Sequence, residues 1–360
     1  IVPSPSLLLP TPEQERQAQK AQEALASSEQ KAAQSRQSAE KAFQEWLTKP
    51  HTATLPDMTG HFDFEKFEGS TLKNLVPNAK DNGSRSDEVP LVPGKKGNAI
   101  QLDGENNVNF PALGRFTRHT PFTISFWMRD PRKVPGYAVV FQACDGTDAG
   151  PHGYDLLIDN GKLTTRLFRH WPGNAIAVAA KSEVPKDTWT YVTVTYDGSS
   201  TAKGLRIYLN GKLDDLEIVR DNKMVKGNGQ HTLVFGQRFR DKGFKGGNID
   251  ELTIFNRNIS PLEVAHLYDG NALTTALTNP QAHLAELKEY YLSAIDSEVR
   301  RTTQELANAR AHQIAVEDGQ YEVAVMEEMP KVRPTFVLAR GRYDAPKTDA
   351  NRVDRHLPNS

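Results

Sequence analysis

Residues 244–268 read FKGGNIDELTIFNRNISPLEVAHLY, and this stretch combines several local signals. A Gly-Gly pair precedes an alternation of apolar and polar residues, which is typical of a half-buried strand. After Asn256-Arg257, Ser260 can cap a helix, Pro261 suits its first position, and Glu263 completes a capping box. The stretch therefore predicts a strand followed by a short helix that packs outside a sheet.

Short strand-like segments continue upstream, so that residues 50–272 form one predicted β domain. Asp-Gly or Asn-Gly pairs separate many of them, and such pairs favour tight turns. These pairs occur at 103–104, 145–146, 160–161, 197–198 and 210–211. Many short strands with regular turn signals indicate an antiparallel sandwich or jelly roll, so the predicted fold class is mainly β.

Two long helical stretches flank this domain, at residues 11–49 and 279–318. The first has small residues at a spacing of three and four, whereas the second has large apolar residues at that spacing. Small side chains facing large ones predict an antiparallel helical hairpin, or coiled coil, with the β domain inserted at its tip. The alternatives are two independent linkers or helices that pair with another chain. Residues 1–10 are predicted to be extended, and residues 319–360 to hold short strands and a polar tail.

The composition excludes some classes of protein. The 360 residues carry 44 basic and 45 acidic side chains, a balance that argues against a dedicated nucleic-acid binder. No apolar run is long enough to span a membrane. Cys144 is the single cysteine, so no intramolecular disulfide, tetrathiolate zinc site or haem attachment motif is expected.

Five phrases carry a resemblance to a known family: GNAIQLDG (97–104), FTISFWMR (122–129), DTWTYVTVTYDG (187–198), GLRIYLNGKL (204–213) and NIDELTIFNRNISPLEV (248–264). Their order and spacing resemble the laminin-G-like, concanavalin A-like jelly rolls, the superfamily that includes the pentraxins. The resemblance implies a jelly roll over about 210 residues. It implies much less about function, because this fold serves lectins, glycosidases, adhesion modules and spacers.

The flanks are similar to a narrower group. LKEYYLSAIDSEVRRTTQELANARA (287–311) and VAVMEEMPKVRPTFVLARGRYDAP (323–346) resemble a planctomycete-type family of large uncharacterised proteins, often linked to cytochrome c. That resemblance implies an extracytoplasmic location, a role in polysaccharide use, and other domains of a parent protein as partners. The chain then looks like an internal fragment, and no Cys-x-x-Cys-His is present in it.

The resemblance also implies a structural Ca²⁺ held by Asp103 and Asp250, with Asp63 or backbone carbonyls as supplements. Calcium prefers six to eight hard oxygen ligands, which suits these residue types. The alternative is that Asp103 serves its turn and Asp250 caps a strand. A pentraxin-type calcium cluster would need loop carboxylates, for which Asp145, Asp148 and Asp155 are candidates.

A basic and aromatic group is the candidate ligand site, with Arg166, Arg169, His170 and Trp171 in one stretch and Arg238 and Arg240 in another. If a jelly roll brings these stretches together, arginine beside the Trp171 ring would suit an anionic or sulfated polysaccharide. The alternatives are a solvated charged surface, with Trp171 partly buried, or arginines that dock the helical hairpin.

Motifs of catalysis are missing from the sequence. Retaining glycosidases of this fold use a Glu-x-Asp-x-Glu strand, and no such triplet occurs. Asp250 and Glu251 are adjacent, so that a regular strand would point them to opposite faces. We therefore expect a non-catalytic binding module, with a structural spacer or protein-interaction domain as the first alternative. A polysaccharide-active enzyme with an unrecognised site is the second alternative.

Overall fold

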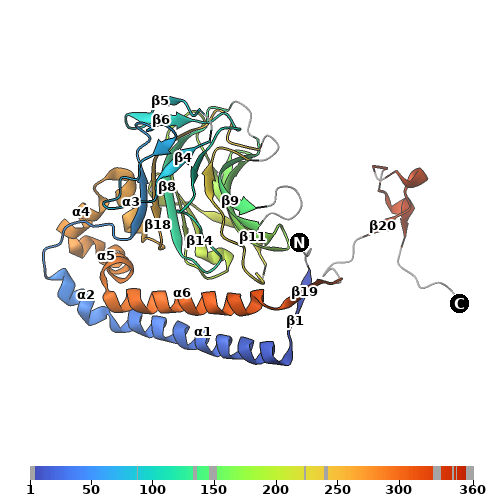
Figure 1. The fold of residues 1–360 in the computed structure, drawn as a ribbon, viewed down its shortest axis with the longest axis horizontal. Coiled ribbons are helices and arrows are strands. Elements are labelled where there is room, and N and C mark those ends of the chain that lie inside the picture. The colour runs from blue at the N-terminus through green and yellow to red at the C-terminus, as the bar shows by residue number, and fades with distance from the viewer. Residues whose placement is uncertain are drawn as a thin grey trace.

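The computed structural model describes residues 5–86, 88–132, 136–145, 152–222, 224–238, 242–326, 334–342, 344–345 and 347–353. Two antiparallel sheets stack face to face, and two long helices run side by side below them in the view of Figure 1. The chain passes through one long helix, builds the sandwich and returns through the other. The predicted fold class, a mainly β sandwich inserted in an antiparallel helical hairpin, is confirmed.

The first sheet has eight strands, and β18 lies at its centre. One edge of β18 pairs with β8, while the other pairs first with β6 and then with β2. The strands of this sheet are β2 (Met58–Phe62), β5 (Leu91–Pro93), β6 (Asn98–Gln101), β8 (Phe122–Arg129), β13 (Thr190–Tyr196), β14 (Leu205–Leu209), β15 (Lys212–Leu213) and β18 (Asn248–Phe255).

The second sheet has nine strands in the order β16-β12-β11-β10-β9-β17-β7-β4-β3. Asn160 and Gly161 both have positive φ and join β10 to β11 in the tight turn expected of an Asn-Gly pair. The strands are β3 (Thr71–Leu72), β4 (Gly83–Arg85), β7 (Val108–Phe110), β9 (Ala138–Asp145), β10 (His152–Asp159), β11 (Lys162–His170), β12 (Asn174–Glu183), β16 (Leu216–Asp221) and β17 (Leu233–Phe235).

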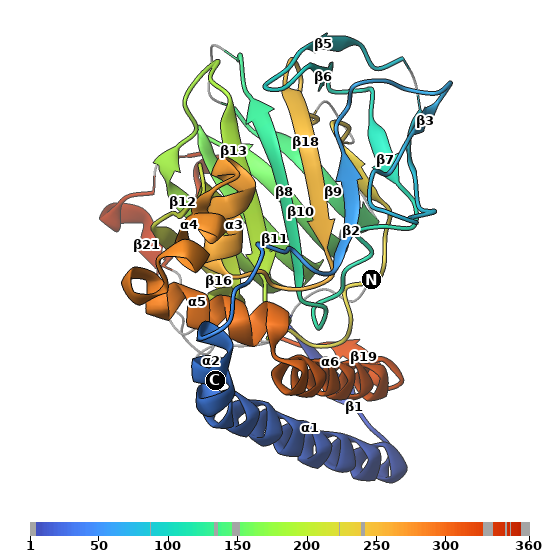
Figure 2. The same cartoon turned by 90° about the vertical axis from the view of Figure 1, so that its left-hand side faces the viewer.

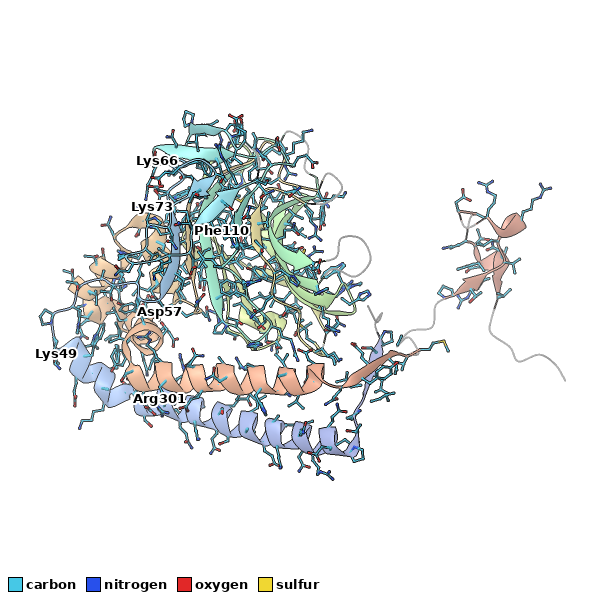
Figure 3. All side chains as sticks on the ribbon, viewed as in Figure 1. Lys49, Asp57, Lys66, Lys73, Phe110 and Arg301 are labelled. Atoms are coloured by element: carbon cyan, nitrogen blue, oxygen red, sulfur yellow. The ribbon has the colours of Figure 1, made fainter. Side chains whose placement is uncertain are left out.

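The main hydrophobic core lies between the two sheets. Alternate residues of β10, namely Tyr154, Leu156 and Ile158, point into it and are fully buried or nearly so. Phe110, labelled in Figure 3, packs against Phe62 in the same core, with the two rings tilted by 54°. Because burying one large apolar side chain contributes about 1.5–3 kcal/mol, this cluster holds the two sheets in a fixed relation.

The helical hairpin joins segments from the two ends of the described chain. In α1 (Pro12–Ser38) and α6 (Ser297–Asp318), Gln14 Nε2 donates to the Gly319 carbonyl at 2.8 Å, and the Ser35 and Thr302 hydroxyls lie 2.7 Å apart. These two contacts show that the helices are antiparallel and pair within the chain. Beyond the helices, β1 (Ser6–Leu9) pairs antiparallel with β19 (Tyr321–Ala324).

The second helical stretch was expected to be one continuous helix over 279–318, and this expectation is wrong. It comprises a 3₁₀ turn (Pro280–His283), α5 (Leu284–Tyr290) and a π turn (Tyr291–Ile295), after which α6 begins anew. Asp296 is non-helical and its side chain accepts from the Val299 amide at 2.8 Å. The chain bends there because Tyr290 and Tyr291 pack into a second core with Phe43. The first stretch likewise divides at Ala39, giving α2 (Glu40–Leu47).

Two further helices cover the outer face of the first sheet (Figure 2). In α3 (Pro261–Asp269), the Ser260–Glu263 capping box is present as expected, and Gly270 ends the helix with φ 73°. Val264 of α3 packs on Tyr208 and Phe255 of the sheet. The remaining short elements are η1 (Ala202–Gly204), α4 (Ala272–Thr278), β20 (Thr335–Phe336), η4 (Ala339–Gly341), η5 (Asp349–Asn351) and β21 (Arg352–Val353).

Candidate functional site

The outer face of the nine-stranded sheet carries a row of polar side chains. Strand register places Asp155 of β10 directly between Gln142 of β9 and Arg166 of β11. Since Leu156 and Leu167 point into the core, these three side chains point away from it. In Figure 1 this face lies on the side of β9 and β11, opposite the sheet face that α3 and α4 cover.

A buried ion pair forms the centre of this row. Arg166 Nε donates to Asp155 Oδ1 at 2.8 Å, and Arg166 Nη2 donates to Oδ2 at 2.5 Å. Asp155 is fully buried and Arg166 is 8% exposed. Burial works against the charged guanidinium, but the Asp155 carboxylate outweighs burial, so that the pKa of Arg166 is raised. Asp155 is therefore a partner of Arg166, and its carboxylate is not open to a calcium ion.

As expected, the Trp171 ring lies against arginine side chains. This arrangement is an internal contact of the protein. The Arg166 guanidinium lies 4.6 Å from the centre of the Trp171 ring, and that of Arg220 lies 5.9 Å from it. Trp171 is partly buried. His170 Nδ1 lies 3.1 Å from the Trp171 carbonyl oxygen, which fixes the start of the following turn. Trp171 thus supports Arg166 more than it offers an open stacking surface.

Arg238 lies on the same face, next to the row. It donates to the Gln142 side-chain oxygen and to the Cys144 sulfur. Burial raises the pKa of the Cys144 thiol to about 11, although the nearby Arg238 opposes this effect, so the thiol is neutral at pH 7. Arg166 and Arg238 therefore come together as expected. Arg240, like Asp148, lies outside the described residues.

Arg169 faces away from this group. It donates to the Gly227 carbonyl at 3.1 Å and to Glu322 of β19 at 3.3 Å. This arginine ties the sandwich to the strand that follows the hairpin. Arg169 therefore holds parts of the protein together, as in the docking alternative, and does not belong to the candidate ligand site.

Tyr137 is the residue of this face that the sequence analysis missed. The residue is 37% exposed, its hydroxyl accepts from Arg166 Nη2 at 3.1 Å, and Lys242 Nζ lies 5.5 Å from the ring centre. Burial of the hydroxyl end raises the pKa of Tyr137, so it stays protonated at neutral pH. An aromatic residue just before the strand AVVFQACD was the available signal.

The three candidate calcium ligands do not form one cluster. Asp103 Oδ1 accepts from the amides of Glu105 and Asn106, at 2.8 and 2.7 Å, and so serves its own turn. In the pairing of β6 with β18, the residue opposite Asp250 lies four positions before Asp103. Asp103 is therefore about 13 Å from Asp250 along the strand direction. Asp63 follows Phe62, the partner of Leu252, and so lies nearer to Asp250. In the described part of the chain, no group of three or more His, Cys, Asp or Glu side chains is arranged to hold a metal ion.

Asp250 and Glu251 lie at a β-bulge in β18, and the expectation that they point to opposite faces is wrong. The register shifts between Asp250 and Thr253, and Glu251 has φ 50°. Because Ile249 and Leu252 both enter the core, the two carboxylates both lie on the outer side of the sheet.

The bulge gives the two carboxylates different electrostatic environments. Burial raises the pKa of Asp250 to about 6. The backbone amides of Lys95 and Lys96, which donate to Oδ2 at 2.8 and 2.9 Å, partly oppose this rise. Asp250 Oδ1 is buried, and none of the described groups donates to it. Contact with His61, and then with Lys96, lowers the pKa of Glu251.

The raised pKa of Asp250 predicts an unusual dependence of stability on pH. The folded state binds this proton more tightly than the unfolded chain, whose aspartates titrate near pH 4. The contribution of Asp250 to stability should therefore fall by about 3 kcal/mol as the pH rises from about 4 to about 6, and stay constant above pH 6. Urea unfolding across this range should show that slope in the wild type relative to Asp250→Asn, which has no proton to lose.

Calcium binding at the bulge stays a prediction, and the wild type and Asp250→Asn can test it. Calcium would bind the ionised Asp250, with Asp63 and backbone carbonyls as further ligands. Millimolar calcium at pH 7 should then raise the melting temperature of the wild type and leave that of Asp250→Asn unchanged. Equal melting temperatures with calcium and with chelator would contradict the site.

Residues 102–265 match a family model described as the concanavalin A-like lectin/glucanases superfamily. No curated protein sequence matches the chain. Solved structures similar to it include the binding domain of Paraclostridial Mosquitocidal Protein 1, with a TM-score of 0.46 and 19% identity over 59% of this chain and 52% of that one. The binding domain of botulinum neurotoxin serotype D has a TM-score of 0.44 and 16% identity over 60% and 52% of the two chains.

The binding domain of botulinum neurotoxin DC, in complex with SialylT, has a TM-score of 0.44 and 17% identity over the same shares. The chain thus spans about half the length of these structures. The family model and the two stacked sheets together establish a concanavalin A-like sandwich.

Proposed function

We propose that the chain is a non-catalytic module that binds an anionic polysaccharide on the outer face of the nine-stranded sheet. The observation that carries this proposal is the exposed Tyr137 ring beside Arg166, Arg238 and Lys242. A partly exposed aromatic ring offers a flat surface for the apolar side of a sugar ring. Cations around it favour carboxylate or sulfate groups on that sugar.

The hydrogen bonds of this face support the same ligand class. Asp155 uses both carboxylate oxygens on Arg166, so the acid at the centre is already paired. Arg238 is bound to neutral groups, Gln142 and Cys144, and forms no ion pair among the described residues. Among the described residues, this face therefore holds two cations without a carboxylate partner, Arg238 and Lys242.

The test is binding to an array of uronic and sulfated polysaccharides, followed by titration calorimetry. Tyr137→Ala is expected to weaken binding at least tenfold, about 1.4 kcal/mol, because it removes the ring without touching the core. The matched control is Tyr321→Ala, which removes a 71% exposed tyrosine from β19 and should leave affinity unchanged. Equal affinity in Tyr137→Ala and the wild type, or no binding to any glycan, would contradict the proposal.

The second candidate is a structural spacer that positions neighbouring domains of a parent protein. Its support is the junction between hairpin and sandwich, where Arg118 pairs with Glu317 and Lys226 Nζ donates to the Gln320 carbonyl at 2.6 Å. A polysaccharide-active enzyme has no supporting arrangement among the described residues. An extracytoplasmic location belongs to the same proposal. None of the described helices is long and apolar enough to cross a membrane.

A further inference from the structure

A polar groove runs between α6 and the end of the sandwich. It consists of two cavities of about 860 and 450 Å³. Five residues line both cavities, so they form one continuous space: Thr59, Pro121, Asn256, Gln304 and Ala307. Asp57 and Arg301, both labelled in Figure 3, lie in the lining of the larger cavity. Ligand pockets typically have volumes of about 300–1,000 Å³, so the groove has room for a small oligomer.

Contacts at the two ends of α6 hold the groove open. Near the start of the helix, Arg300 pairs with Asp57 at 2.6 Å. Nearer its end, Arg310 donates to the Asp197 carbonyl at 3.1 Å, and Glu317 pairs with Arg118. Between these points, no hydrogen bond or ion pair joins the described residues of the helix to those of the sandwich.

The middle of α6 presents short or polar side chains to the groove. Gln304 donates to Asn308 of the same helix at 3.0 Å, and Ala307 lies between them. Across the described part of the interface, no hydrogen bond links Gln304, Ala307 or Asn308 to the sandwich. Two polar walls that face each other without bonding are suited to a hydrated polar ligand.

The sandwich wall supplies cations and amides. Arg115 lines the smaller cavity and Arg206 the larger one, and both are exposed. Neither guanidinium forms an ion pair or a hydrogen bond with any described residue. The amides of Asn256 and Gln230 are likewise unbonded within the described chain and line the same space. Of the six arginines that line the groove, four pair with carboxylates, so that Arg115 and Arg206 are the two left available among the described residues.

We infer that this groove binds an acidic oligosaccharide, with Arg115 and Arg206 holding carboxylate or sulfate groups and the amides holding hydroxyls. Side-chain amides both donate and accept, which matches sugar hydroxyls, and arginine matches planar or tetrahedral anions. An acidic peptide fits less well, because the edge of β2, where Thr59 lines both cavities, is already bonded by Asn74 and Leu75. That edge is therefore not free to pair with a peptide strand.

This inference takes its ligand class from the proposed function but rests on different residues. The outer-face site depends on Tyr137, which is absent from the lining of both cavities. A chain with both sites should bind two short acidic oligosaccharides. Variants of one site should leave the other intact, so that the two proposals can fail separately.

The test is titration calorimetry with a heparin-derived hexasaccharide and, separately, an oligogalacturonate hexamer. Ala307→Trp places a large ring where the two cavities meet, and Ala307 is only partly exposed on the surface of a helix. This variant is expected to lose one of two binding sites for at least one hexamer. The matched control, Ala24→Trp on an exposed face of α1, should retain both sites. Arg115→Ala combined with Arg206→Ala should weaken the same site at least tenfold without adding bulk.

The outcomes separate the two proposals. Loss of a site in Ala307→Trp and in the double arginine variant, with Tyr137→Ala losing the other site, supports both. Unchanged stoichiometry and affinity in both groove variants overturns the groove site, whatever Tyr137→Ala does. A poly-glutamate peptide that competes as well as the hexamers at this site overturns the ligand class. No binding of either hexamer by the wild type overturns both proposals.

Discussion

Replacing Asp155 with alanine is expected to lower the free energy of unfolding by about 3–5 kcal/mol, because it leaves a buried cation without its partner. Arg166 is 8% exposed and makes both of its carboxylate bonds to Asp155. Water cannot replace that carboxylate fully at a site covered by Tyr137 and Trp171. Equilibrium urea unfolding of the purified variant measures the loss.

Two further variants show whether the loss comes from the unpaired charge. Asp159→Ala removes an exposed carboxylate from the same strand and should change stability by less than about 0.5 kcal/mol. Asp155→Leu combined with Arg166→Met removes both charges and should recover most of the stability lost in Asp155→Ala. A double variant no more stable than Asp155→Ala would show that the cost arises from packing and not from the buried arginine.

Replacing Glu317 with alanine is expected to loosen the hairpin from the sandwich and to cost about 2–4 kcal/mol. Glu317 accepts from Arg118, which is 5% exposed, and from the Lys226 amide at 3.1 Å. Burial lowers the pKa of Arg118, against the attraction of Glu317, so removal of Glu317 leaves a charge that the site disfavours. Hydrogen exchange should accelerate in α6 and α1 before it does so in the core strands.

A surface carboxylate of the same helix provides the control. Glu298 pairs with Arg301, and both side chains are more than half exposed. Glu298→Ala should therefore cost no more than about 0.5 kcal/mol and leave hydrogen exchange in α6 nearly unchanged. Equal acceleration in both variants would mean that the Arg118 contact does not hold the hairpin to the sandwich.

Features that depend on local chemistry could be predicted from the sequence. The capping boxes at Thr11 and Ser260 are both present, and the positive φ of Asn160 and Gly161 forms the expected hairpin turn. The position of that turn also predicts which residues form the buried ion pair. In a hairpin around residues 160 and 161, position 155 stands opposite position 166. Counting outward from the Asn-Gly pair is therefore enough to place Asp155 beside Arg166.

The remaining features depend on distant packing. The helix break at Asp296 follows from burial of Tyr290 and Tyr291 against Phe43, a residue about 250 positions earlier in the chain. The bulge at Glu251 carries no Gly or Pro, so alternation predicted the wrong face for its side chain. Arg238 reaches Gln142 through the pairing of β17 with β9, which no short-range pattern indicates.

The ribbon of β1 and β19 gives this protein a mechanical property. Ser6 pairs with Ala324, and Leu9 with Tyr321, so the flanking chain leaves both strands at the same end. Tension applied to the two flanking segments would break the hydrogen bonds between β1 and β19 one pair after another. The Gln14–Gly319 contact and then the two helices would part next. The sandwich would be loaded only after these contacts have parted. It should therefore keep its fold at forces that already separate the ribbon and the helices.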